Sequence, residues 1–133
     1  MLDRLNESFN TMQQSLSLHA KRQEVLSANI ANADTPGYKA RDFDFSDRLD
    51  QALDQQDSGA LKTTSAGHMA GRTGVLDDAQ LGYRVPTQSS LDGNTVDMDM
   101  ERIDFAENSL RYQADVQMLT SHIQNMSTAM RSE

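Results

Sequence analysis

The sequence predicts a mainly α-helical protein in which two long terminal helices pack as an antiparallel, coiled-coil-like hairpin. The loop-rich middle is expected to contain short extended segments. All seven glycines and both prolines lie between Pro36 and Gly93, so the 35 residues before this middle and the 40 after it contain no helix breaker. Both arms also place apolar residues at alternating spacings of three and four. The chain is therefore predicted to consist of an N-terminal helix (1–35), a middle with the turn, short segments and a mobile loop (36–93), and a C-terminal helix (94–133).

The N-terminal arm carries a seam of this kind on one side of a helix. Its positions are Leu2, Leu5, Phe9, Met12, Leu16, His19, Gln23, Leu26, Ile30 and Ala33. Such spacing is typical of a helix that packs lengthwise on another helix. His19 and Gln23 are polar, so we expect them to fix the register or to be partly exposed. Leu18 and Val25 lie beside the seam and are expected to contact a second neighbour.

The segment from Asn29 to Tyr38 ends this helix. Pro36 disfavours helical geometry at Thr35, and Pro36 followed by Gly37 fits the centre of a type II turn. Asn29 and Asn32, three apart, lie on one face of the helix beside the turn, so their side chains are placed to bond exposed backbone; ordinary polarity of a helix end is the alternative. The predicted assembly motif consists of Asn29, Ile30, Asn32, Thr35, Pro36, Gly37, Tyr38, Phe43 and Phe45. Its three aromatic residues are expected to anchor either neighbouring chains or the chain's own second helix.

After the turn, residues 38–45 are predicted to be extended, with Lys39, Arg41, Phe43 and Phe45 on one side. Ser46 is then expected to cap a short helix whose apolar side contains Leu49, Ala52 and Leu53. Residues 54–80 are rich in Gly, Ser, Thr, Asp and Gln, which indicates a mobile loop. Leu81, Tyr83 and Val85 alternate as on a strand that ends at Pro86, and 89–93 is a turn-rich connector.

The C-terminal arm begins near Asn94, Thr95 or Asp97, each of which is a suitable N-cap. Acidic Asp99 and Glu101 follow at the positive end of the helix. Its predicted seam is Phe105, Ser109, Tyr112, Val116, Leu119, Ile123, Met126 and Met130. Because a single two-helix hairpin has only one narrow seam, we expect the arms to be loosely ordered in the monomer and fixed by neighbouring subunits.

The composition excludes several classes of protein. Only 37% of residues are hydrophobic and 5% aromatic, so a large globular core is not expected. The absence of cysteine excludes disulfides and thiolate chemistry. The formal net charge of −8, with no basic segment, argues against nucleic-acid binding. No apolar run is long enough for a membrane span, and the N-terminus lacks the apolar region of a signal peptide.

Catalytic and metal-binding patterns are also missing from the sequence. His19, His68 and His122 are widely separated. The acidic run Asp42, Asp44, Asp47 and Asp50 lacks the glycine and bidentate glutamate of an EF-hand loop, so it is interpreted as a solvated acidic face. No phosphate-binding loop or nucleophile elbow is present. We therefore expect neither an enzyme nor a protein with a cofactor.

Residues 27–39, Ser-Ala-Asn-Ile-Ala-Asn-Ala-Asp-Thr-Pro-Gly-Tyr-Lys, resemble the N-terminal signature of bacterial flagellar rod and hook proteins. Within this family, four further runs and the small middle resemble a subunit of the proximal rod. These runs are residues 40–45, residues 61–64 followed by His68, residues 93–97 and residues 107–114. The resemblance covers nearly the whole chain, with 54–60 and 69–80 least constrained.

The resemblance implies a structural subunit of the periplasmic rod of the flagellar basal body. Such subunits are exported through the flagellar type III apparatus, which would explain the missing cleavable signal peptide. Their terminal helices pack with neighbours into a helical tube that transmits motor torque. The implied partners are further copies of the chain, the rod proteins FlgC and FlgF, FliE and the MS-ring protein FliF.

Two alternatives remain open at the level of sequence. One is a paralogous rod subunit such as FlgC, against which the run of residues 107–114 argues. The other is a soluble helical adaptor or secretion chaperone that binds partners without polymerising. A stable folded dimer in solution would favour the adaptor, whereas presence in purified basal bodies would favour the rod subunit.

Overall fold

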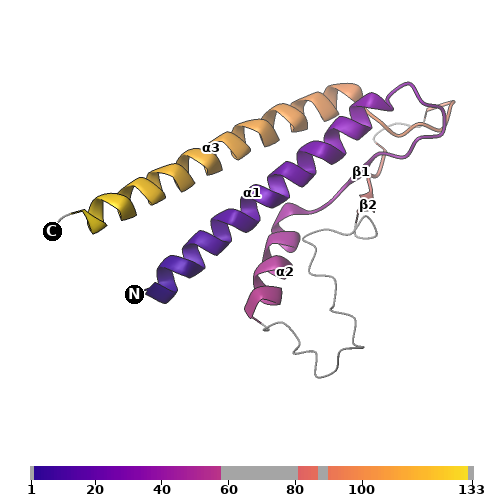
Figure 1. Cartoon of the computed structure of the whole chain (residues 1–133). Helices are drawn as coiled ribbons and strands as arrows, with labels where there is room; N and C mark the ends of the chain where they lie inside the picture. The colour runs from indigo at the N-terminus through magenta and orange to yellow at the C-terminus, as the bar shows by residue number, and fades with distance from the viewer. Residues whose placement is uncertain (1, 58–80, 87–89, 132–133) are drawn as a thin grey trace, which may run out of the picture.

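The protein consists mainly of two long antiparallel helices with smaller elements along one side (Figure 1). The computed structural model describes residues 2–57, 81–86 and 90–131. In chain order the elements are α1 (Leu2–Ala31), β1 (Arg41–Asp42), α2 (Phe45–Asp57), β2 (Gly82–Tyr83) and α3 (Met98–Met130). This architecture confirms the predicted fold class. No helix in the described ranges is long and apolar enough to cross a membrane.

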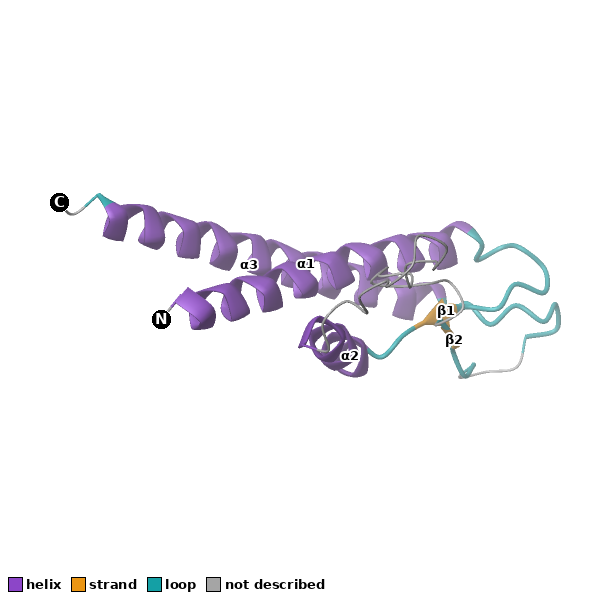
Figure 2. Ribbon diagram, turned by 60° about the horizontal axis from the view of Figure 1, so that its bottom comes forward, coloured by secondary structure: helices purple, strands orange, loops and turns teal. Residues whose placement is uncertain are grey.

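Helix α1 is the central element of the fold. It packs against α3 along most of its length, and it also packs against α2 and β1 (Figure 2). Leu18 and Val25, which lie beside the seam, are buried together with Leu26. Ala40 and Phe43 from the segment around β1 complete the buried apolar side chains of the described residues. Helix α1 thus has the second neighbour that Leu18 and Val25 predicted.

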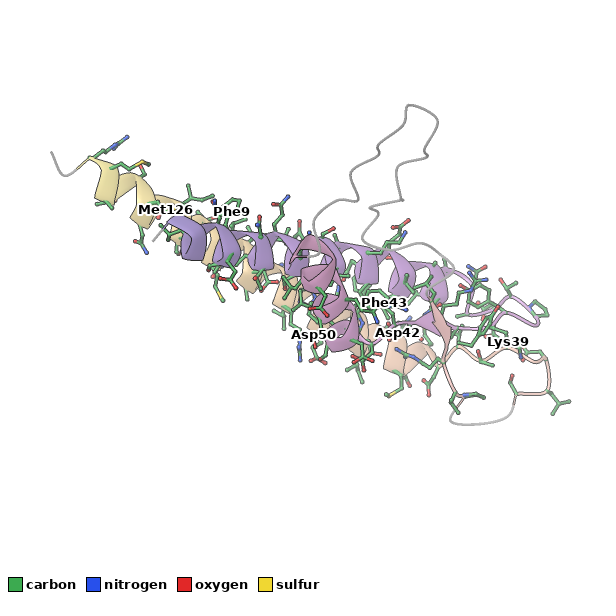
Figure 3. The ribbon with its side chains drawn as sticks, turned by 90° about the horizontal axis from the view of Figure 1, so that it is seen from below. Phe9, Lys39, Asp42, Phe43, Asp50 and Met126 are labelled. Carbon is green, nitrogen blue, oxygen red and sulfur yellow. The ribbon has the colours of Figure 1, made fainter. Side chains whose placement is uncertain are left out.

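The core lies at the end of the hairpin where the loops connect the helices. In the described part of the chain, no buried residue of α1 precedes Leu18, and none of α3 follows Asn108. Phe9 and Met126 lie toward the opposite, open end of the hairpin, whereas Lys39 lies at the loop end (Figure 3). The loop end is therefore packed in several layers, and among the residues that the structure describes only α1 and α3 reach the open end.

The extended segments are shorter than the sequence predicts. Strands β1 and β2 form an antiparallel pair in which Arg41 faces Tyr83 and Asp42 faces Gly82. Tyr83 and Val85 are both exposed, so they do not form a buried strand face. The predicted alternation of residues 38–45 ends early because α2 already begins at Phe45.

The ends of the helices show which residues cap them. The Asp44 side chain accepts hydrogen bonds from the backbone N–H groups of Ser46 (2.9 Å) and Asp47 (3.2 Å). Asp44 therefore caps α2, and the prediction that Ser46 does so was wrong by two residues. Asp97 caps α3 by accepting from the N–H groups of the second and third residues of that helix. Helix α2 includes 54–57, and the rest of the predicted loop, 58–80, lies outside the described residues.

Candidate assembly site

The turn after α1 is built from local hydrogen bonds and one glycine. The N–H of Thr35 donates to the carbonyl oxygen of Asn32 (3.0 Å), and the N–H of Tyr38 donates to that of Thr35 (3.2 Å). Gly37 has a φ of 75°, which side chains with a Cβ rarely adopt. The proline and glycine thus form the turn that the sequence predicts at this position.

Asn94 bonds three carbonyl groups of the turn that follows the C-terminal end of α1. Its Nδ2 atom lies 3.1, 2.7 and 3.0 Å from the carbonyl oxygens of Asn32, Ala33 and Thr35. Its Oδ1 accepts from the N–H of Val96 at 2.8 Å. Asn94 is buried, so water cannot replace these bonds. A residue that the sequence suggested as an N-cap of α3 instead closes the end of α1.

The turn and the segment that leads into α3 are also joined through their backbones. The N–H of Gly37 donates to the carbonyl of Asp92, and the N–H of Thr95 donates to that of Tyr38, both at 3.0 Å. The Thr95 hydroxyl accepts from the N–H of Ala40 at 2.8 Å. These bonds hold the two connecting segments side by side at the loop end.

Asn29 links α1 to both β1 and α3. Its side chain is fully buried, and it bonds the backbone of Arg41 twice: Nδ2 donates to the carbonyl oxygen (2.7 Å) and Oδ1 accepts from the N–H (3.1 Å). Nδ2 also donates to Glu101 Oε2 at 3.2 Å. The Tyr38 hydroxyl contacts Asn29 Oδ1 at 3.4 Å. The segment 29–38 is called the hinge here, and Asn29 therefore forms internal bonds of the hinge within one chain.

Asn32, three residues later, bonds locally. Its Nδ2 donates to the carbonyl oxygen of Ala28 at 2.8 Å, and its Oδ1 accepts from the Thr35 hydroxyl at 3.2 Å. Both contacts lie within the last turn of α1 and the turn that follows. Asn32 thus bonds exposed backbone beside the turn, which is the role expected for this position.

A cluster of charged side chains joins the strand pair to both long helices. Arg84 follows β2, and its guanidinium lies 2.6 Å from Asp42, 2.8 Å from Asp104 and 3.1 Å from Glu101. Asp42 also accepts two hydrogen bonds from Arg22 of α1, at 3.0 and 3.2 Å. Arg84 thus bridges β1 and α3, and Asp42 extends the contact to α1.

The cluster shifts the pKa values of its two central carboxyl groups in opposite directions. Burial raises the pKa of Glu101, and this effect outweighs the hydrogen bond from Asn29 and the charge of Arg84. Burial also acts to raise the pKa of Asp42. Hydrogen bonds from Arg22 and Arg84 together lower this pKa by a larger amount, so it lies below the ordinary value. Asp42 is therefore stably ionised, whereas an ionised Glu101 is held at a cost.

Polar side chains also form the middle of the contact between α1 and α3. Asn108 Oδ1 lies 2.8 Å from His19 Nδ1, and Asn108 Nδ2 donates to the carbonyl oxygen of His19 (2.9 Å) and to Gln23 Oε1 (2.6 Å). Gln23 Nε2 donates to the Ser109 hydroxyl at 2.8 Å. His19 and Asn108 are both buried, so these bonds require this register of the two helices.

This polar layer continues toward the open end and toward α2. The Ser15 hydroxyl donates to Asp115 Oδ2 at 2.6 Å, and His19 Nε2 lies 3.7 Å from the same oxygen. The His19 ring stacks on Phe45 of α2, with the ring centroids 4.2 Å apart. His19 of α1 therefore contacts the two other helices, α3 and α2.

The packed side of α3 is centred one residue earlier than the sequence predicts. Asn108 and Asp115 bond α1, whereas Val116, Ile123 and Met130 of the predicted seam are 38%, 47% and 79% exposed. The physical reason is that α1 offers polar groups at this level, and these bond polar partners on α3. Val116, Ile123 and Met130 are consequently turned outward.

The remaining predicted residues are divided between the interior and the surface. Of the predicted assembly residues, Asn29 and Phe43 are buried, Ile30, Asn32, Tyr38 and Phe45 are half-buried, and Thr35, Pro36 and Gly37 are exposed. On the seams, Leu26 is buried, Leu5 is exposed, and Phe9, Met12, Leu16, Phe105, Tyr112, Leu119 and Met126 are half-buried. The side chain of Leu2 lies outside the described part.

The residues that sequence reasoning missed are polar: Arg22, Arg84, Asn94, Glu101 and Asn108. Asn94 and Asn108 do lie within runs that carry the family resemblance, which was the available signal. No signal pointed to Arg84, because its partners come from segments far apart in the sequence. Among the described residues, no group of three or more His, Asp or Glu side chains could hold a metal ion.

Comparisons with known proteins identify the family of this chain. A family model described as flagella basal body rod protein matches residues 9–39, which include it. The chain is 49% identical to the flagellar basal body rod protein FlgB of Proteus mirabilis (strain HI4320) and to that of Yersinia enterocolitica, with 98% of each chain covered. It is 48% identical to FlgB of Escherichia coli (strain K12), with 99% of each covered. The chain belongs to the FlgB family.

Membership of the FlgB family decides between the classes that the sequence left open. FlgB proteins are structural proteins of the flagellar basal body rod, so the chain is a rod protein and not an enzyme. These relatives do not support the alternative interpretation as a soluble helical adaptor or secretion chaperone. These matches cover nearly the full chain and are to FlgB proteins, so they do not support the alternative of a FlgC-like subunit.

Proposed function

We propose that this chain is a subunit of the proximal rod and that its terminal helices pack with neighbouring subunits into a helical tube that transmits motor torque. The observation that carries the proposal is an apolar stripe on α3 formed by Val116, Ile123 and Met130, which is called the outer stripe here. Its residues are seven apart, so they share one side of the helix, and all three are exposed.

The outer stripe has the character of a contact surface. It lies beside the side of α3 that meets α1, so a third helix placed there would touch both members of the hairpin. Exposed apolar surface of this kind marks interaction sites in soluble proteins. A contact between this surface and a different surface of the next subunit is heterologous, and repetition of such a contact builds an open helical assembly.

The exposed part of the hinge supplies a second proposed contact. Thr35, Pro36 and Gly37 are exposed at the loop end, while Asn29 and Asn94 hold the turn from inside. A turn fixed in this way presents the same surface in every copy of the chain. We therefore assign neighbour contacts to the exposed turn, and internal support to Asn29.

The proposed partners follow from membership of the rod family. They are further copies of this chain, FlgC, FlgF, FliE and the MS-ring protein FliF, together with the export apparatus during secretion. The proposed location is the periplasmic part of the rod, reached without a cleavable signal peptide.

A pair of neighbouring substitutions tests the role of the outer stripe. Ile123→Asp places a charge on the stripe, whereas Gln124→Asp places the same charge one position further round the helix, where the residue is also exposed. In cells that carry only the variant chain, Ile123→Asp should abolish swimming and remove the chain from purified basal bodies. Gln124→Asp should leave both unchanged.

Circular dichroism of the purified variants separates assembly from folding. Both variants should retain the helical signal of the unchanged chain, since both positions are exposed within the hairpin. Normal swimming with Ile123→Asp, or equal loss with both variants, would rule out the outer stripe as the contact surface. Absence of the unchanged chain from basal bodies would overturn the rod function itself.

A further inference from the structure

Two methionines and a histidine line one hollow in the open half of the hairpin. Met12 of α1 and both Met118 and His122 of α3 share this shallow hollow, which measures about 490 Å³. Met118 and His122 are four residues apart, so they lie on the same side of α3. Met12 comes from the facing helix. The three side chains therefore join the two long helices at one place.

The ring of His122 has a nitrogen without a partner. Its Nε2 atom is shielded from solvent and has no hydrogen-bond partner among the residues that the structure describes. Buried polar atoms are normally paired, because a buried nitrogen without a partner has lost its hydrogen bonds to water. The ring nitrogens of neutral histidine are also the commonest metal ligands in proteins. The unsatisfied atom is thus one that a metal ion could bind.

The donor atoms of the hollow favour one class of metal. Thioether sulfur binds soft ions such as Cu(I), and imidazole also suits copper, whereas carboxylates and water suit hard cations. The sequence contains no cysteine, so thioethers are its only sulfur donors. The other residues that line the hollow are uncharged: Ala114, Gln117, Ser121 and Asn125. Two thioethers and one imidazole without a carboxylate fit a soft monovalent ion.

The two methionines can adjust their sulfur atoms to such an ion. Met118 is 52% exposed and Met12 is half-buried, so neither is fixed in the core. Methionine is unbranched and has three rotatable bonds. In the described part of the chain, the buried residues of α1 begin only at Leu18. An ion held at Met12 would therefore link α1 to α3 where the helices bury least.

We propose that Met12, Met118 and His122 bind a soft monovalent metal ion of the Cu(I) class, and that the bound ion links α1 to α3. Binding replaces water on the ion by two sulfur atoms and the Nε2 atom, and no atom is oxidised or reduced. The site belongs to the hairpin of a single chain and does not depend on the rod function. Its consequence is that the open end becomes ordered when the ion is bound.

NMR of the full chain with ¹³C-labelled methionine methyl groups and ¹⁵N-labelled histidine tests the site directly. Ag(I) is the probe, because it has the charge and softness of Cu(I) but is not oxidised by air. One equivalent should shift the methyl signals of Met12 and Met118 and the Nε2 signal of His122. The signals of the remaining methionines should stay in place.

Single substitutions measure the contribution of each donor. Met12→Leu and Met118→Leu conserve volume, and His122→Gln removes the imidazole. Loss of an outer-shell partner typically lowers metal affinity by about 10–100-fold, so loss of a ligand should weaken Ag(I) binding at least as much. Met126→Leu is the matched control. Met126 also lies four residues from His122 but does not line the hollow, so this variant should bind Ag(I) as the unchanged chain does.

Hydrogen exchange tests the link between the helices. With Ag(I) bound, amides near Met12 and near His122 should exchange several-fold more slowly than in the metal-free chain, because the ion holds both helices. In Met12→Leu, the added protection should be lost from α1. Circular dichroism of each metal-free variant should match that of the unchanged chain.

Three results would overturn the proposed site. Unchanged Ag(I) affinity in Met12→Leu would place the ion on α3 alone. Equal losses of affinity in Met118→Leu and Met126→Leu would show that the methionines bind the ion without a defined site. Displacement of Ag(I) by an equal concentration of Zn(II) would refute the assignment to a soft metal.

Discussion

Asn29 on the last turns of α1 donates a hydrogen bond of 3.2 Å to Glu101, and both side chains are fully buried. The bond joins the end of one long helix to the beginning of the other, inside the hinge that carries the family signature. It also places an acidic side chain where water cannot solvate it. The stability of the hinge should therefore respond to pH.

Glu101→Gln should become more favourable relative to the unchanged chain as the pH rises. The folded pKa of Glu101 lies above its unfolded value, so its stabilising contribution is complete below about pH 4.5 and is lost as the pH rises through the folded pKa. The glutamine side chain is neutral at every pH, so the variant does not lose stability at this position as the pH rises. Urea unfolding at several pH values should show this trend, and Glu107→Gln, on the exposed side of α3, should not differ by more than about 0.5 kcal/mol at neutral pH.

Asp42→Asn should destabilise the chain by about 1.5–3 kcal/mol at neutral pH, because Arg22 and Arg84 each lose a charged partner. The folded pKa of Asp42 is lowered, so its contribution is present above about pH 4 and is lost as the pH falls through the folded value. The deficit of the variant should thus shrink only in strong acid. A deficit that already disappears at pH 6 would contradict the ion-pair explanation.

Asn94→Asp should cost about 1–3 kcal/mol of unfolding free energy. The carboxylate cannot donate to the carbonyl oxygens of Ala33 and Thr35, and it places negative charge at the negative end of α1. Asn94→Ala should be comparable, since it also removes the donor. Asn10→Asp, at an exposed position of α1, is the matched control and should change stability by less than about 0.5 kcal/mol.

Gly37→Val should destabilise the turn by about 1–2 kcal/mol or more and impair assembly. No atom lies within 4 Å of a Cβ built at this position, so the cost comes from the positive φ rather than from a clash. Gly37→Asn should recover part of the loss, because asparagine tolerates this conformation. Chemical denaturation and swimming assays check both variants; full stability and normal motility of Gly37→Val would refute this account.

Hydrogen exchange of the monomer should divide each long helix in two. We expect amides of α1 near Leu26 and of α3 near Asn108 to be protected, and those of 2–14 and 116–130 to exchange quickly, because no described residue is buried in the latter segments. Circular dichroism should correspondingly show incomplete helicity. Full helicity with one cooperative melt in a monomeric sample would contradict the expectation that neighbours order the arms.

The sequence predicted those features that depend on a single stretch of chain. Pro36 and Gly37 do not continue a helix whatever their surroundings are. In the same way, the side chain of Asp97 can cap a helix through its own chemistry. The predicted face of α3 was displaced at Val116 because apolar periodicity considers one helix at a time. Ser15 and His19 bond polar partners on α3, and such complementarity belongs to a pair of helices.

The same limit applies to the hinge. Asn94 was recognised only as a possible helix cap, since the carbonyl groups that it bonds precede it by about sixty residues in the chain. Arg84 meets Asp42 and Glu101 only after the strand pair has formed. Long-range polar contacts of this kind are determined by the fold, and periodicity cannot locate them.

The open end of the hairpin has a mechanical consequence. The chain leaves α1 and enters α3 at the loop end, and the two helices diverge toward their free ends at the open end (Figure 1). A force that pulls these two ends apart sideways therefore opens the α1–α3 interface one layer at a time, and it meets the polar layer of His19 and Asn108 before the hinge. A force along the helix axes instead loads all layers together in shear. The hairpin is thus weak against peeling and strong against sliding.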